Sequence, residues 1–310
     1  MEIHALRAWV RTWPLMARSG YPPSHRVMTG AMLPSSPMST PAAGASGAHP
    51  PRVPRRLGRR ARRTIVRLRG QRVLAILGMH RSGTSSLAGS LEAAGLYLGE
   101  DDVDRASQWN AKGYRESRVL NRLHEQLLVA NGGSWEDPPE VVSWSEDHRR
   151  RRDGFIRSRA TKRYWGFKDP RTILLIDGWL EALPEMGIVA TLRDPTTVAR
   201  SLQRRQQTAT AEEWLDLWLV YNRRLWVLHS QRGFPIIDFD LPPAAYQQRL
   251  TTLIGELGLR PAVPGESFFE PPLRDHQSSP RLALPTEVEE LHEELKRIAA
   301  EQAAPVRASI

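Results

Sequence analysis

The sequence contains no cysteine among its 310 residues. Disulfide bonds and thiol chemistry are therefore excluded, and the commonest ligands of structural zinc sites are missing. No apolar run approaches the ~20 residues that a helix needs to cross a bilayer. Arg7, Arg11 and Arg18 interrupt the apolar stretch at the N-terminus, which argues against a secretory signal. The lack of cysteine does not decide the compartment by itself, and a cytoplasmic enzyme is the favoured interpretation.

Acidic residues are almost missing from residues 1–70, which hold thirteen Arg and, as their single acidic residue, Glu2. The whole chain has 44 Lys and Arg against 34 Asp and Glu, a formal net charge of +10. The remainder therefore carries 31 basic and 33 acidic side chains, a net charge of −2. Because the basicity belongs to the N-terminal segment, we expect no nucleic acid partner for the rest of the protein.

Residues 1–70 are predicted to be a disordered tail rich in Arg and Pro. The stretch 21–51 consists largely of Pro, Ser, Ala and Gly without any period, so it cannot bury enough apolar surface to offset ordering. The basic stretch 55–69 has two interpretations: a basic helix that makes weak contact with a membrane surface, or a solvated lead-in. Met38 is an alternative start of the chain.

The most informative stretch is 73–86, VLAILGMHRSGTSS. It begins with a short apolar run typical of a buried strand, and a segment with helical spacing follows it. Between them, Gly78 and Gly83 frame a turn that ends in hydroxyl side chains. Strand, glycine-framed turn and helix aim backbone N–H groups and a helix N-terminus at a phosphate. Thr84 stands where the usual P-loop has its lysine, so the cation of this loop is Arg81.

A second segment ends a predicted strand at Arg193 and starts a helix at Asp194 and Pro195, which suit the N-cap and first helical positions. Ser201 lies two turns into that helix, so Arg193 and Ser201 could grip one phosphate from two sides. Taken singly, Arg193 is better explained as a surface ion pair and Ser201 as an ordinary helix residue. The functional interpretation depends on their occurring together.

Strands alternate with helices along the rest of the chain. The predicted strands are 72–77, 164–168, 187–192 and 234–239, and the main predicted helices are 84–94, 115–130, 145–162, 172–183, 210–228, 244–257 and 286–300. This order predicts an α/β, P-loop-type three-layer fold with a central parallel sheet in 71–262. We expect 263–310 to add a C-terminal loop and helix. Ligands of such sheets lie at the carboxyl ends of the strands, where Gly78 and Arg193 are found.

Together these segments resemble the sulfotransferases that use 3′-phosphoadenosine 5′-phosphosulfate (PAPS). More closely, GMHRSGTS, the N-x-K-G-Y-x-E segment 110–116, FKDPR at 167–171 and LRDP…RS are similar to a group of bacterial sulfotransferases. The similarity covers about 71–260. It implies a sulfuryl transfer from PAPS to a hydroxyl of an unidentified carbohydrate, lipid or small metabolite, without a metal. The implied PAPS-binding residues are Gly78, Arg81, Ser82, Gly83, Thr84 and Ser85 at the 5′-phosphosulfate and Arg193 and Ser201 at the 3′-phosphate.

The resemblance also suggests catalytic roles. Arg81 is expected to stabilise the charge on the leaving phosphate, an effect often worth ~3 kcal/mol for a single donor. Glu116 is our first candidate for the base that takes the acceptor proton, Asp102 the second and His80 the third. For Glu116, a purely structural role at a helix N-terminus is an equal alternative. Lys168 and Arg171 either line the acceptor or cofactor pocket or form a structural ion pair with Asp169.

The sequence departs from the bacterial group at Ala111, where Pro is frequent, and at Arg115, where an aromatic residue is common. Both departures fall near the expected acceptor pocket. The C-terminal PAPS segment of cytosolic sulfotransferases is not evident, and Arg274 and Arg281 are candidates to replace it.

Two other functions remain open. One is a P-loop kinase of a small molecule, which would depend on ATP and Mg²⁺ but has Thr84 in place of the lysine. The other is a non-catalytic, membrane-associated nucleotide-binding protein whose Arg-rich tail is the working part. The sequence indicates neither the acceptor nor the oligomeric state.

Overall fold

The computed structural model describes residues 70–99, 113–260, 268–269 and 282–303. All of them belong to one compact unit, Arg63–Ile310. Its centre is a four-stranded parallel sheet in the order β2-β1-β3-β4. The strands are β1 (Arg72–Leu77), β2 (Tyr164–Lys168), β3 (Gly187–Leu192) and β4 (Ile236–Asp238). The predicted α/β class with a parallel sheet between helices is therefore confirmed, while the predicted N-terminal tail lies outside the described residues.

Strand β1 lies inside the sheet and pairs with β2 on one side and β3 on the other. Successive side chains of a strand point to opposite faces. Leu74 and Ile76 are buried on one face, and Ala75 and Leu77 are equally buried on the other. Helices must therefore cover both faces, as is usual for parallel sheets.

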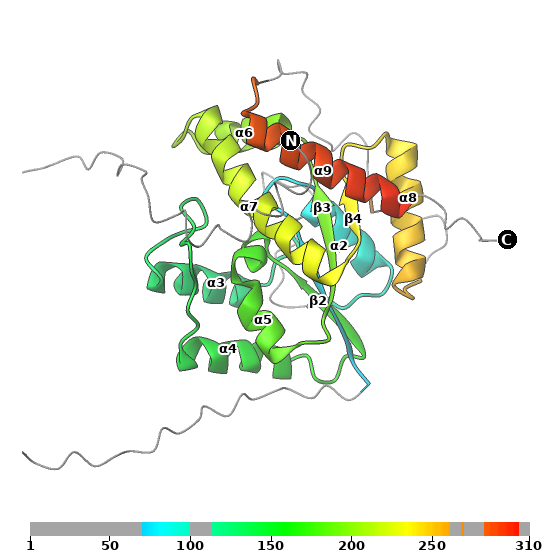
Figure 1. Cartoon of the computed structure of the whole chain (residues 1–310). Coiled ribbons are helices and arrows are strands. Elements are labelled where there is room, and N and C mark those ends of the chain that lie inside the picture. The colour runs from blue at the N-terminus through cyan, green and yellow to red at the C-terminus, as the bar shows by residue number, and fades with distance from the viewer. Residues whose placement is uncertain (1–69, 100–112, 261–267, 270–281, 304–310) are drawn as a thin grey trace, which may run out of the picture. The chain divides into compact units, whose positions relative to one another are not determined.

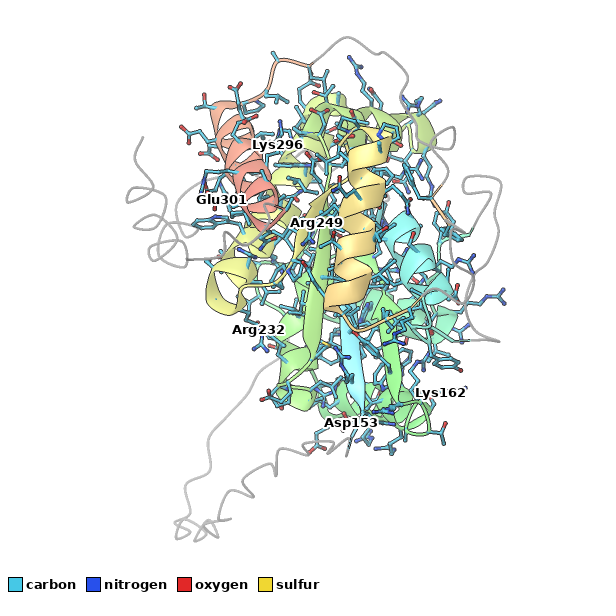
Figure 2. All side chains as sticks on the ribbon, turned by 90° about the vertical axis from the view of Figure 1, so that its right-hand side faces the viewer. Asp153, Lys162, Arg232, Arg249, Lys296 and Glu301 are labelled. Atoms are coloured by element: carbon cyan, nitrogen blue, oxygen red, sulfur yellow. The ribbon has the colours of Figure 1, made fainter. Side chains whose placement is uncertain are left out.

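One face of the sheet is covered by α2 (Thr84–Ala93) and α8 (Pro243–Glu256). In Figure 2, α8 lies in front of the sheet, roughly along the strands, and carries the labelled Arg249. The two helices and the strands share one apolar core, and burying each large side chain in it contributes about 1.5–3 kcal/mol. This core includes Leu74, Ile76, Leu87, Leu91, Val189, Ile237, Tyr246, Leu250 and Leu253.

The long helix α7 (Ala211–Arg232) and the C-terminal helix α9 (Thr286–Ala303) pack against each other, and α9 also contacts β4 (Figure 1). The predicted capping box of α7 is present: the Thr210 hydroxyl accepts from the Glu213 N–H at 3.2 Å, and the Glu213 carboxylate accepts from the Thr210 N–H at 2.7 Å. The side chain of Gln302 ties α9 to the sheet edge, because it accepts from Ile236 N (2.8 Å) and donates to Phe234 O (3.0 Å).

Several helix ends differ from the predicted ones. The helix expected from residue 115 is α3 (Arg118–Ala130), because Ser117 caps it through a 3.3 Å bond from Leu120 N. The helix expected over 145–162 is α4 (Glu146–Arg157), and it buries Phe155 and Ile156 instead of being exposed all round.

The single helix expected over 172–183 is a 3₁₀ turn, η1 (Pro170–Leu175), followed by α5 (Ile176–Ala182). Helix α6 (Pro195–Arg205) begins as predicted, with the Asp194 carboxylate accepting from Thr197 N at 2.8 Å. Among the helices of the described part of the chain, none is long and apolar enough to span a membrane.

Candidate active site

The turn after β1 is shaped by two glycines. Gly78 has a φ of +141°, and a Cβ there would lie 2.5 Å from the Thr191 hydroxyl on β3. Gly83 precedes α2 with a φ of +89°, and a Cβ there would overlap the ring of Phe239. Only glycine combines this backbone conformation with such close packing. The turn is therefore held tightly against β3 and the residue that follows β4.

Arg81 and Arg115 have φ values of 66° and 58°, the positive values of non-glycine residues in the described part of the chain. This left-handed conformation costs roughly 1–2 kcal/mol for residues with a Cβ, and such strain is concentrated at functional sites. Arg81 lies in the glycine-framed turn, and Arg115 lies in the segment that leads to Glu116. The two strained residues thus fall in two of the segments predicted to be functional.

Ser82 stabilises the turn from inside. Its hydroxyl donates to Met79 O at 2.6 Å and lies 3.0 Å from the Thr191 hydroxyl, and its backbone N–H donates to Met79 O at 3.3 Å. Both groups of Ser82 are hydrogen-bonded within the protein, so the contact of Ser82 with the phosphosulfate of PAPS stays a prediction. Thr84 and Ser85 lie in the first turn of α2, where backbone N–H groups have no acceptor within the helix.

The structure brings the two predicted phosphate-binding segments together. Arg81 Nε donates to Ser201 Oγ at 2.8 Å, and Arg193 Nη1 donates to Arg81 O at 3.0 Å. The segments are 112 and 120 residues apart in sequence. They meet because β1 and β3 are parallel neighbours, so the turns after them leave the same edge of the sheet.

Arg193 is buried rather than exposed on the surface, with 4% of its area accessible. Its Nε lies 3.5 Å from a carboxylate oxygen of Asp240, its carbonyl accepts from Trp218 Nε1 at 3.1 Å, and its guanidinium lies 5.2 Å from the ring centre of Phe239. These contacts come from α7 and from the residues after β4. They fix the side chain beside the turn, which a solvated ion pair would not do.

A buried ion pair joins Glu116 to the end of β2. Lys168 Nζ lies 2.5 Å from Glu116 Oε1 and 3.3 Å from Ser85 Oγ, while Asn121 Nδ2 donates to Glu116 Oε2 at 3.0 Å. The side chain of Lys168 is 1% exposed and that of Glu116 is 14% exposed, so Glu116 is the end of the pair that reaches the surface. The structure thus pairs Lys168 with Glu116 instead of the expected Asp169, and Asp169 pairs with Arg171. Glu116 precedes the N-cap of α3 and is not helical.

The neighbouring carboxylate, Asp169, has other partners. It accepts from Arg171 Nε at 2.9 and 3.2 Å and lies 3.0 Å from His124 Nδ1, and it is fully buried. His124 Nε2 accepts from Trp179 Nε1 at 2.9 Å, which assigns the imidazole proton to Nδ1. Burial alone would raise the pKa of Asp169, but Arg171 and His124 hold it below its ordinary value.

His80 lies among aromatic rings. Its ring centre is 4.3 Å from that of Trp135 and 5.9 Å from that of Tyr221, whose hydroxyl donates to Trp135 O at 3.0 Å. Burial, followed by the positive charge of Arg171, lowers the pKa of His80 to about 3. The imidazole is therefore neutral near pH 7, and its low basicity makes it a weaker candidate for the general base than a carboxylate.

Several predicted residues fall outside the described part of the chain: Asp102, Ala111, Arg274 and Arg281. Conversely, the site includes residues that the sequence did not single out. His124 lies on the apolar face of α3 with Leu120 and Leu127, a position that reads as core. In the described ranges, no group of three His, Asp or Glu side chains is arranged to hold a metal ion.

No family model matches the sequence, and no curated protein matches it. Solved structures with a similar fold include sulfotransferases. The sulfotransferase domain of the Synechococcus PCC 7002 olefin synthase is 17% identical, with a TM-score of 0.49 over 73% of this chain and 94% of that one. The sulfotransferase domain of the curacin biosynthetic pathway is 14% identical, with a TM-score of 0.46 over 73% and 98%. A sulfotransferase of Alicyclobacillus acidocaldarius is 16% identical, with a TM-score of 0.41 over 75% and 96%.

Proposed function

We propose that the protein is a sulfotransferase that moves a sulfuryl group from PAPS to a hydroxyl group of a carbohydrate, lipid or small metabolite. The observation that carries the proposal is the contact of Arg81 with both Ser201 and Arg193. Cationic and hydroxyl groups from two turns converge there beside the N-terminus of α2. Such an arrangement suits a ligand with two anionic ends, because each turn can hold one of them.

The donor binds between the ends of β1 and β3. The backbone N–H groups at the start of α2 and the hydroxyls of Thr84 and Ser85 hold the 5′-phosphosulfate, and the helix dipole favours its negative charge. Arg193 and Ser201 hold the 3′-phosphate. Arg81 lies between them, so its guanidinium can stay with Ser201 or turn to the phosphate that leaves.

The reaction needs positioning and charge stabilisation, and little covalent work by the protein. The acceptor oxygen attacks the sulfur, and a new S–O bond forms. The bond between the sulfur and the 5′-phosphate oxygen breaks, and its electron pair leaves on adenosine 3′,5′-bisphosphate. Arg81 stabilises the charge that develops there.

The acceptor proton goes to Glu116 in this proposal. The support is its place at the surface end of the ion pair with Lys168, next to Ser85 in the first turn of α2. Lys168 is then left beside the reacting groups, where its ammonium can offset the negative charge of the transferred sulfuryl group. His80 is neutral and weakly basic, so we assign it a positioning role.

A thermal-shift comparison tests the donor. Adenosine 3′,5′-bisphosphate should raise the melting temperature of the full-length protein, and ATP with Mg²⁺ should raise it less, since any ligand that prefers the folded state stabilises it. A larger shift with ATP and Mg²⁺ would favour the small-molecule kinase. Incubation with ³⁵S-labelled PAPS and a lipid or metabolite extract then identifies the acceptor, and no labelled product with any acceptor class would favour the non-catalytic alternative.

The Arg-rich stretch 55–69 is the subject of a separate proposal, weak attraction to anionic membrane surfaces. Flotation with vesicles that contain phosphatidylserine, compared with neutral vesicles, measures it for the full-length protein. Equal recovery with both kinds of vesicle would contradict it.

A further inference from the structure

Arg171 is the best-fixed cation of the site that the proposed reaction does not use. The Asp169 carboxylate accepts hydrogen bonds from the backbone N–H of Arg171 (2.9 Å) and from Arg171 Nε (2.9 and 3.2 Å). The carboxylate is itself held by His124, which is fixed by Trp179 on α5. The guanidinium plane of Arg171 is therefore anchored through its Nε edge to α3 and α5, and its orientation is set before any ligand binds.

The other edge of the same guanidinium is unused. Within the described residues, no group accepts a hydrogen bond from Nη1 or Nη2 of Arg171. The side chain is 10% exposed, and Nη1 and Nη2 are not among the fully buried polar atoms, so these donors are accessible from outside. A guanidinium that is fixed along one edge and accessible along the other can bind an oxyanion of a ligand without first being oriented, so this arrangement points to a ligand acceptor.

Arg171 lies on the β2 side of the turn after β1, whereas the proposed PAPS site lies on the β3 side. The sheet order β2-β1-β3-β4 sets the turn after β1 in the middle, with Arg193 after β3 on one side and η1 with Arg171 after β2 on the other. η1 packs against α7, which carries Tyr221. Arg171 also acts electrostatically on both Tyr221 and His80. It therefore faces the region next to His80 that a donor clasped between β1 and β3 leaves to the acceptor.

Aromatic rings lie around His80, on which the charge of Arg171 acts. The ring centre of His80 lies 4.3 Å from that of Trp135 and 5.9 Å from that of Tyr221. His80 Nε2 is buried and, like the outer edge of Arg171, lacks a hydrogen-bond partner among the described residues. Flat ring surfaces with a fixed guanidinium suit a ring-shaped compound that carries a planar or tetrahedral oxyanion.

We propose that Arg171 binds an anionic group of the acceptor, so that the acceptor is a hydroxyl compound that already carries a carboxylate or a sulfate ester. This inference rests on the proposed sulfotransferase function. It assigns to Arg171 a role in choosing the acceptor and none in holding PAPS. Asp169 and His124 act through Arg171 as positioning residues.

The test uses three matched probes that differ at one carbon: p-nitrophenyl β-D-glucuronide, p-nitrophenyl β-D-glucoside and its 6-sulfate. Calorimetric titration into the protein saturated with adenosine 3′,5′-bisphosphate measures their affinities. At least one anionic probe should bind about 10-fold more tightly than the neutral glucoside, as expected for a charge-assisted bidentate contact. The tighter of the two anionic probes tells a carboxylate from a sulfate ester.

Two substitutions of Arg171 sharpen the test. Arg171→Gln should abolish the preference for the anionic probe, and Arg171→Lys, which keeps the charge beside Asp169 but loses the planar fork, should reduce it. Arg157→Gln, which removes an exposed positive charge from α4, is the matched control and should keep the full preference. If Arg171→Gln fails to fold, Arg171→Lys carries the comparison.

Equal affinities for the three probes, no binding of any of them at millimolar concentration, or a preference that survives in both Arg171 variants would overturn the proposal. The thermal shift with adenosine 3′,5′-bisphosphate separates this failure from that of the proposed function. If the nucleotide stabilises the wild type and the Arg171 variants alike, the donor site is intact and only the acceptor proposal is wrong. If it stabilises none of them, the proposed function is itself wrong.

Discussion

The two sides of the turn after β1 are built from different interactions. Toward β3, Arg81 donates to the Ser201 hydroxyl, Arg193 donates to the Arg81 carbonyl, and Arg193 also forms a longer ion pair of 3.5 Å with Asp240. Toward β2, two short ion pairs stand side by side, Lys168 with Glu116 and Arg171 with Asp169.

The difference indicates on which side of the turn a negatively charged donor would bind. On the β3 side, Arg81 donates to a neutral hydroxyl and Arg193 to a neutral carbonyl, contacts that do not cancel their positive charge, which suits a bisphosphate ligand. On the β2 side, each cation has a close carboxylate that fixes its orientation, and removing one partner of such a buried pair is costly. The β3 side is thus suited to binding the donor, and the β2 side to orienting the acceptor and taking its proton.

The largest expected effect tests the β2 side. Glu116→Gln should lower kcat about 100-fold or more, because the proton acceptor is lost, while the affinity for adenosine 3′,5′-bisphosphate stays within about twofold. Steady-state rates with ³⁵S-labelled PAPS and calorimetry measure the two quantities. Unchanged turnover would reject Glu116 as the base.

The second prediction concerns the other ion pair. Asp169→Asn should lower the free energy of unfolding by about 3 kcal/mol, because it leaves the buried Arg171 without its counter-charge. Urea denaturation measures this. Asp147→Asn, which breaks an exposed pair with Arg150 on α4, is the control and should cost no more than about 0.5 kcal/mol. Similar losses of unfolding free energy in the two variants would show that the buried Asp169–Arg171 pair stabilises the fold no more than an exposed pair does.

The third prediction moves to the β3 side. Arg193→Ala should weaken the binding of adenosine 3′,5′-bisphosphate about 100-fold, the usual effect of truncating a desolvated cation that contacts an anion. Calorimetry with Arg150→Ala as an exposed control measures the change. Binding that is as tight in Arg193→Ala as in the control would place the nucleotide elsewhere.

A fourth prediction concerns pH. Burial lowers the pKa values of His80, to about 3, and of His124 from the ordinary 6.5. Below pH 6.5 the unfolded chain therefore binds protons at these residues while the folded chain does not. Stability is fully present above pH 6.5 and falls as the pH drops to about 5, by up to about 1.4 kcal/mol per pH unit for each histidine. Urea denaturation at several pH values should show a smaller slope for His80→Gln, and equal slopes would contradict the assignment.

The smallest effect is expected for Ser201→Ala. The variant loses one hydrogen bond to Arg81, and we expect the affinity for adenosine 3′,5′-bisphosphate to fall about 3- to 10-fold, well below the effect of Arg193→Ala. The same calorimetric series measures it. A loss as large as that of Arg193→Ala would mean that Ser201 organises the turn as a whole.

The same contrast explains what the sequence could predict. The β3-side residues lie in two continuous stretches, and local spacing alone marks their strand, turn and helix. The β2-side partners are 52 residues apart for Glu116 and Lys168 and 45 for His124 and Asp169. Local sequence periodicity does not predict which carboxylate will form an ion pair with which cation. The strands were predicted well, with β4 shorter than expected, whereas helix ends depended on details such as the cap at Ser117.

The contact between Gln302 and β4 has a consequence for the sheet as a whole. Strand β4 is an edge strand of the sheet. The unpaired backbone N–H and C=O groups of an edge strand can pair with a strand of another molecule. A glutamine amide carries a carbonyl acceptor and an NH₂ donor, so it can match the acceptor and donor of a peptide unit. By accepting from Ile236 and donating to Phe234, Gln302 imitates one residue of a fifth strand and so shields this margin from pairing with a second molecule.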